Sequence, residues 1–154
     1  MLNSICIKTN YSLLSSLISI DSLIDFARNN KLKTLAICDD NLTSAKYFYN
    51  KCIENNIKPV IGLDVKYIDK SLMMYAINYE GYKNLIKLST IMSEREILLD
   101  DLKNYNANLI VVIPYDSLLF YDEIVSLYEI IYIGVLNFEE EKQANSLNKT
   151  VFLN

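Results

Sequence analysis

Three apolar runs carry or end in residues that could do chemistry. Leu35 to Asp40 ends in two adjacent carboxylates, Pro59 to Val65 contains Asp64, and Ile5 to Asn10 contains Cys6 and Lys8. If these runs are neighbouring parallel strands, their carboxyl ends meet at one rim, which is where α/β folds bind ligands. Carboxylate oxygens at such a rim are the donors that hard cations such as Mg²⁺ or Mn²⁺ prefer.

The three carboxylates, Asp39, Asp40 and Asp64, have two interpretations. They could hold Mg²⁺ or Mn²⁺, or they could pair with Lys8, with Asp40 and Asn41 capping the next helix. The second interpretation is favoured because an ammonium has no lone pair to offer a metal, whereas it neutralises nearby carboxylates. Lys8 is therefore expected to be a fixed cation rather than a catalytic base.

Histidine is absent from all 154 residues. Its absence excludes Ser-His-Asp and Cys-His catalysis, and zinc sites built on imidazole. The three cysteines, Cys6, Cys38 and Cys52, have no CxxC spacing, so we expect reduced, packed thiols in a cytoplasmic protein. A net charge of −4 and the lack of a long apolar run argue against a nucleic-acid grip and a membrane span.

Strand patterns alternate with helical patterns along the chain, which predicts one α/β domain over 1–154 with a mostly parallel sheet. Helical spacing of Ile20, Leu23, Ile24 and Ala27 behind Ser19 predicts a capped first helix. Strands are expected at 5–7, 35–37, 59–65, 72–77, 109–113, 130–135 and 151–153, and further helices around 45–52, 82–88, 120–127 and 139–147. Asp69-Lys70 is expected to be a tight turn.

Four short sequence motifs resemble motifs of the PHP domain (polymerase and histidinol phosphatase), in the same order and with the same spacing as in that family. They are most similar to the version at the N-terminus of the alpha subunit of bacterial DNA polymerase III. The motifs are Ile7-Lys8-Thr9-Asn10-Tyr11-Ser12-Leu13-Leu14, Leu35-Ala36-Ile37-Cys38-Asp39-Asp40-Asn41, Asn56-Ile57-Lys58-Pro59-Val60-Ile61-Gly62 and Asn78-Tyr79-Glu80-Gly81-Tyr82-Lys83-Asn84-Leu85.

The resemblance implies part of a distorted (β/α)7 barrel, which in active members holds a metal cluster that hydrolyses phosphoesters. The metal-binding pattern is degenerate here. The positions that match family ligands are occupied by Ser4, Cys6, Lys8, Ser15, Asp40 and Asp64, with Asp39 beside them. The resemblance also implies a chain cut off within a longer polymerase subunit.

These features predict a non-catalytic structural or docking module of a replicative DNA polymerase, with no metal and no other cofactor. The alternative is a residual Mg²⁺- or Mn²⁺-dependent phosphoesterase or proofreading exonuclease that uses Asp39, Asp40 and Asp64. An unrelated α/β binding domain is a third possibility. Expected partners are the rest of the alpha subunit, other replisome subunits, and a second copy paired through an exposed edge near Val151 to Leu153.

Overall fold

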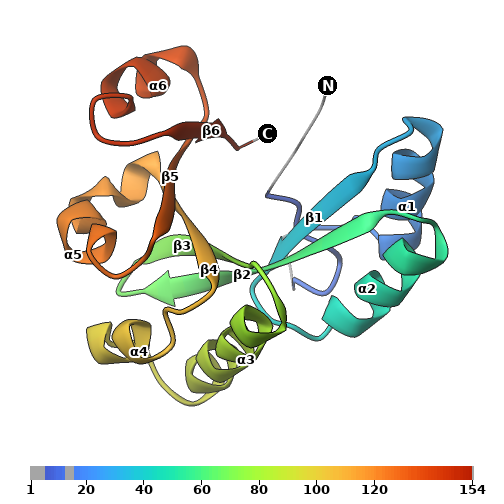
Figure 1. Cartoon of the computed structure of the whole chain (residues 1–154), viewed down its shortest axis with the longest axis horizontal. Helices are drawn as coiled ribbons and strands as arrows, with labels where there is room; N and C mark the ends of the chain where they lie inside the picture. The colour runs from blue at the N-terminus through green and yellow to red at the C-terminus, as the bar shows by residue number, and fades with distance from the viewer. Residues whose placement is uncertain (1–5, 13–15, 154) are drawn as a thin grey trace.

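A curled, six-stranded sheet carries helices on its outer side (Figure 1). The structure is a computed structural model that describes residues 6–12 and 16–153. The strands are β1 (Thr34–Asp39), β2 (Lys58–Tyr67), β3 (Lys70–Ala76), β4 (Leu109–Pro114), β5 (Ile130–Val135) and β6 (Thr150–Phe152). The helices are α1 (Ile20–Asn29), α2 (Ala45–Glu54), α3 (Tyr79–Glu94), α4 (Leu99–Asn104), the 3₁₀ helix η1 (Tyr115–Phe120), α5 (Tyr121–Val125) and α6 (Phe138–Ala144).

The strands lie in the order β1-β2-β3-β4-β5-β6. Three of the five neighbouring pairs are parallel, and β3 runs antiparallel to both β2 and β4. The carboxyl ends of β1, β2, β4, β5 and β6 therefore share one rim of the sheet. This mostly parallel half-barrel confirms the predicted fold class, part of a PHP-type barrel.

The start of α1 is as the sequence predicts, whereas the turn of the β2–β3 hairpin is shifted by one residue. Ser19 precedes α1, and its hydroxyl accepts a hydrogen bond from the N–H of Ser22. Tyr67 pairs with Lys70, so the hairpin loop consists of Ile68 and Asp69 rather than the predicted Asp69-Lys70. No helix in the described part of the chain is long and apolar enough to cross a membrane.

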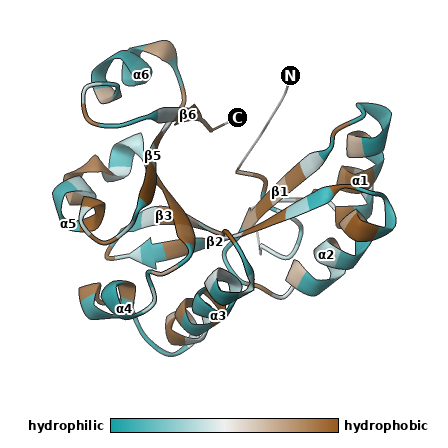
Figure 2. Ribbon diagram, in the orientation of Figure 1, coloured by the Kyte–Doolittle hydropathy of each residue, from teal (hydrophilic) through white to brown (hydrophobic). Residues whose placement is uncertain are grey.

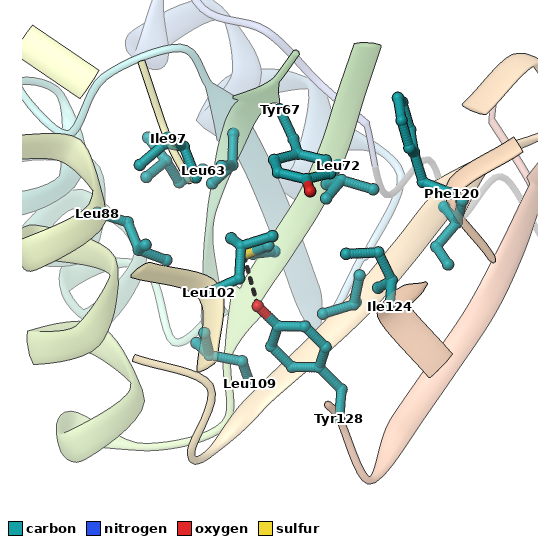
Figure 3. Packing of buried hydrophobic residues seen from close by; sticks show 14 of the residues in the cluster. Leu63, Tyr67, Leu72, Leu88, Ile97, Leu102, Leu109, Phe120, Ile124 and Tyr128 are labelled. Carbon is teal, nitrogen blue, oxygen red and sulfur yellow. Dashed lines mark hydrogen bonds between the residues drawn. The ribbon is translucent and has the colours of Figure 1, made fainter. Parts of the chain in front are cut away.

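Side chains alternate between the two faces of the sheet and build separate apolar layers. On the outer face, Leu63 and Val65 of β2 pack with α3, α4, η1 and α5 (Figure 3). In the same layer, the Tyr128 hydroxyl donates to the Met74 sulfur across 3.8 Å. Strands β4 and β5 are apolar along most of their length, whereas β2 and β3 also carry hydrophilic segments and the helices mix apolar and polar residues (Figure 2).

The concave face carries its own apolar cluster. It includes Cys38, Met73, Tyr75 and Val112, with Cys6, Val60, Ile110, Tyr132, Val151 and Leu153 packed against it. Position 62 on this face is a glycine because the Tyr75 ring occupies the space that a side chain would need. A Cβ at Gly62 would stand 2.6 Å from Tyr75 Cε1.

Several predicted boundaries are wrong. Ile5 lies outside the described residues, and the described part of the predicted first strand is irregular, although the carbonyl of Ile7 accepts a hydrogen bond from Cys38 N–H. The single helix predicted over 120–127 is η1 followed by α5, which ends at Val125. The sequence analysis missed α4 altogether, because six residues give too short a pattern.

Candidate functional site

The Lys8 ammonium lies on the Asp64 carboxylate at the predicted rim. Lys8 Nζ is 2.7 Å from Asp64 Oδ2, and the two side chains are 26% and 2% exposed. Burial would lower the pKa of Lys8, but the hydrogen bond and charge of Asp64 hold that pKa above its usual value. The pair confirms that Lys8 is a charged partner of a rim carboxylate.

A second lysine reaches the same carboxylate oxygen. Lys66 Nζ lies 3.3 Å from Asp64 Oδ2 and donates to Ser71 Oγ at 2.5 Å. Burial would raise the pKa of Asp64, but the hydrogen bond and charge of Lys8 and the charge of Lys66 hold it below the usual range. Asp64 Oδ1 is buried and accepts no hydrogen bond from any described residue. Asp64 is thus ionised, with one oxygen bound by two ammonium groups and the other without a donor.

Asp39 has a different environment, at the end of β1. Its Oδ1 accepts from the backbone N–H of Thr9 at 2.6 Å and the hydroxyl of Ser12 at 2.8 Å. Its Oδ2 accepts from the hydroxyls of Thr9 and Ser44, each at 2.7 Å. Four protein donors therefore occupy this buried carboxylate, and its evident role is to anchor the segment containing Thr9 and Ser12.

Asp40 joins neither arrangement directly. It is half-buried, its Oδ1 accepts from the side-chain amide of Asn41, and its N–H donates to Ser12 Oγ. The prediction that Asp40 and Asn41 cap α2 is wrong, because the N-cap residue is Ser44, whose own side chain is engaged by Asp39 instead of the helix.

The expected convergence of Asp39, Asp40 and Asp64 fails for Asp39, whereas the charge of Asp40 contributes to the raised pKa of Lys8, the partner of Asp64. Successive side chains of a strand point to opposite faces of the sheet. Cys38 packs on the concave face, so Asp39 lies on the helix side. Leu63 packs on the helix side, so Asp64 lies on the concave face. Among residues 6–12 and 16–153, no three His, Cys, Asp or Glu side chains are grouped so that they could hold a metal.

The thiols near Asp64 are disfavoured as thiolates by their burial. Cys6 is half-buried and Cys38 is buried, and burial raises the pKa of both. Cys52 packs in the core against α1, where burial raises its pKa to about 12. The predicted structural role of Cys38 and Cys52 is confirmed by their burial. Ser4 and Ser15 lie outside the described residues.

Sequence reasoning missed the donors that surround the carboxylates. Lys66 is two residues after Asp64 and thus on the same face of β2, and Ser71 is its partner in the hairpin register. That spacing could have pointed to Lys66. Thr9 and Ser12 carried no comparable signal, because their approach to Asp39 depends on how the N-terminal segment crosses the end of β1. Ser44 reaches Asp39 through the turn between β1 and α2, which the sequence pattern did not predict.

Comparison with known protein families matches residues 5–144 to the PHP domain. The chain belongs to the PHP domain family. This match covers most of the chain, including both the Lys8–Asp64 pair and the Asp39 network.

Several similar proteins are named DNA polymerase III subunit alpha. The protein from Ureaplasma parvum is 40% identical over 97 residues, which is 62% of this chain and 10% of that protein. The one from Halalkalibacterium halodurans is 34% identical over 122 residues, 72% of this chain and 11% of that protein. The one from Staphylococcus epidermidis is 31% identical over 131 residues, 80% of this chain and 12% of that protein. The chain thus spans about a tenth of the length of the curated relatives that it matches.

The metal cluster that the PHP family implies does not fit the described side chains of this PHP domain. Asp39 is saturated by four donors, Asp64 Oδ2 is held by two ammonium groups, and the cysteines beside Asp64 favour the protonated thiol. Within the described residues, Asp64 Oδ1 is the one buried carboxylate oxygen that accepts no hydrogen bond.

Proposed function

We propose that this PHP domain is a non-catalytic structural and docking part of a bacterial replicative DNA polymerase. The observation that carries the proposal is the Lys8–Asp64 contact of 2.7 Å, in which a protein cation occupies a position that matches a family metal ligand. An ammonium offers no lone pair and activates no water, so the rim lacks the means to generate a hydroxide near neutral pH.

The association with a polymerase rests on the relatives, which carry the name DNA polymerase III subunit alpha and are about ten times as long as the matched region. The proposal places the domain in DNA replication in the cytoplasm, with the rest of the alpha subunit as its first partner. The coding sequence around these residues tests it. A reading frame that continues into polymerase motifs supports the assignment, and a frame that encodes another enzyme contradicts it.

Hydrolysis assays test the lack of catalysis. The chain and its Asp64→Asn variant are incubated with a generic phosphodiester and with single-stranded DNA, in Mg²⁺ or Mn²⁺. We expect no turnover above the background of the variant. Metal-dependent hydrolysis that the parent chain shows and Asp64→Asn lacks would contradict the proposal.

The same assay addresses a residual metal-dependent phosphoesterase or exonuclease, the second candidate. The observation in its favour is the buried, donor-free Oδ1 of Asp64, because an unpartnered carboxylate oxygen is a suitable ligand for Mg²⁺ or Mn²⁺. Against it stands the distribution of Asp39 and Asp64 on opposite faces of the sheet, which prevents them from sharing one ion.

Self-association is a further part of the proposal. β6 is the last strand in the sheet order and pairs with β5; its three residues are half-buried, and two of them, Val151 and Phe152, are apolar. A strand edge of this kind pairs readily with a second copy. Sedimentation over a range of concentrations should show a dimer that Val151→Lys weakens; a strict monomer at high concentration would contradict this.

A further inference from the structure

The β2–β3 hairpin presents an apolar side chain from an unfavourable backbone conformation. Ile68 has φ of 57° and is 62% exposed. Its loop has two residues, a length at which glycine or asparagine normally occupies a position with positive φ. A β-branched residue in this region is strained, and an exposed one gains no burial in return.

The other left-handed positions show what the chain uses where only conformation matters. Among the described non-glycine residues, φ is also positive at Lys31, Asn56 and Asn108. None of these three is β-branched, and two are asparagine, which tolerates this conformation. Ile68 is the exception, so conformation and solubility alone do not account for it.

Ile68 belongs to a wider group of exposed apolar side chains at the carboxyl-end rim. Six large apolar side chains in the described residues are more than about 60% exposed. Four of them lie in the connections after β2, β4 and β5. We call these four the rim patch: Ile68 at 62%, Leu119 at 67%, Leu136 at 65% and Phe138 at 78%.

The segments that carry the rim patch are packed together. Lys70, at the start of β3, forms a 3.7 Å salt bridge with Asp116 of η1. The Tyr67 ring at the end of β2 meets the Phe120 ring at the end of η1, with centroids 5.2 Å apart. On the other side of η1, Tyr121 donates from its hydroxyl to the carbonyl of Leu147, just after α6. The hairpin tip, η1 and α6 therefore form one continuous support.

We propose that the rim patch is a docking surface for an apolar region of the same, longer polypeptide. This inference rests on the proposed function, because the relatives place about nine tenths of the polymerase outside the matched region. Four side chains are few for a stable complex of separate proteins, which usually involves about 20–30 residues on each side. A covalently linked partner needs less surface, since linkage raises its effective concentration to about the millimolar range.

Charge also argues against nucleic acid as the occupant. The lysines nearest the hairpin tip, Lys66 and Lys70, are engaged by Asp64 and Asp116. The chain has a formal net charge of −4. The rim patch itself contains no charged residue, so its chemistry matches an apolar protein surface.

Thiol labelling tests the proposal. Ile68→Cys and Phe138→Cys are made in the 154-residue chain and in the complete polypeptide, with Phe26→Cys in α1 as the matched control, since Phe26 is also apolar and exposed. Maleimide labelling is measured against the background of the three native cysteines. We expect labelling at positions 68 and 138 to slow by about tenfold or more in the complete polypeptide, as for side chains buried at an interface, with little change at position 26.

Equal labelling rates in both proteins would overturn the proposal. Protection that is already present in the 154-residue chain, together with a dimer in sedimentation, would assign the patch to a second copy and would also overturn it. The outcome is separate from that of the proposed function, because the sequence and polymerase activity of the complete polypeptide show independently whether it is a polymerase.

Discussion

Lys8 and Thr9 are adjacent in the chain, yet they bind two different buried carboxylates on opposite faces of the sheet. Lys8 Nζ contacts Asp64 Oδ2 at 2.7 Å on the concave side, and the N–H and hydroxyl of Thr9 donate to Asp39 on the helix side. The two residues before them alternate in the same way, because Cys6 packs in the concave cluster and Ile7 packs against the cluster under α1. The N-terminal segment is thereby fastened across the end of β1 by one ion pair and one hydrogen-bond network.

Lys8→Met should destabilise the fold by about 2 kcal/mol, because Asp64 keeps a buried charge with only the more distant Lys66 beside it. Lys66→Met is the matched control and should cost less, since the Lys66 side chain is more exposed and its contact is longer. Chemical denaturation at neutral pH measures both. Equal stabilities of Lys8→Met and the parent chain would refute the structural role of the ion pair.

The effect of Lys8→Met should depend on pH. The folded-state pKa of Asp64 lies below the ordinary aspartate value of 3.8, so its contribution is present above that pH and disappears as pH falls through the lower folded value. The pKa of Lys8 lies above 10.5, so its contribution is present below that pH and disappears as pH rises through the higher folded value. The difference between parent and variant should therefore be largest between these limits and shrink in strong acid.

Asp39→Asn should cost about 3 kcal/mol, because an amide NH₂ would face donors and leave buried hydroxyls unpaired. Asp40→Asn is the matched control, because Asp40 is the adjacent residue, is only half-buried and accepts one hydrogen bond from a side chain. We expect it to change the free energy of unfolding by less than about 1 kcal/mol. A reversed order of the two losses in urea unfolding would show that Asp39 is not the anchor.

Sequence patterns predicted the strands and helices that carry strong periodicity. The Ser19 cap with Ile20, Leu23, Ile24 and Ala27 gave α1 correctly, and continuous apolar runs gave β1, β4 and β5. The six-residue α4 and the 3₁₀ geometry of η1 were missed, because so few residues do not define a period.

For the site, sequence reasoning predicted that Lys8 pairs with at least one of the three carboxylates, which Asp64 confirms, and wrongly grouped Asp39 with Asp64. Position at a strand end predicts nearness to the rim, which was enough to bring a long lysine side chain to Asp64. It does not by itself say which face of the sheet a side chain lies on. In the β1–β2 register Asp39 pairs with Leu63, so these two side chains share one face of the sheet. Asp64 is one residue further along β2 and therefore lies on the opposite face.

Gly62→Ala should destabilise the fold by about 2 kcal/mol through overpacking. The added Cβ would stand 2.9 Å from the backbone carbonyl oxygen of Ile37 and 2.6 Å from Tyr75 Cε1. Gly134→Ala is the control, because its Cβ would meet only the flexible end of Leu153 among the nearest atoms. Thermal unfolding should rank Gly62→Ala well below Gly134→Ala, and similar melting temperatures would contradict the packing of Tyr75 over Gly62.

Ile68→Asn should stabilise the 154-residue chain by about 1 kcal/mol, because asparagine accepts a positive φ with less strain and little burial is lost. The converse change, Asn56→Ile, should cost a similar amount at a position where φ is 55°. Urea unfolding of both variants checks the signs. A loss of stability in Ile68→Asn would mean that the hairpin tip makes contacts in the chain itself that outweigh its strain.

Binding of Mn²⁺, followed by the electron paramagnetic resonance signal of the free ion, tests most directly whether Lys8 occupies the place of a metal. The chain is titrated into Mn²⁺ at neutral pH beside its Asp64→Asn variant. We expect the signal of free Mn²⁺ to be the same with either protein as in buffer, because the Lys8 ammonium occupies Asp64. A stoichiometric loss of that signal with the parent chain, abolished by Asp64→Asn, would contradict it.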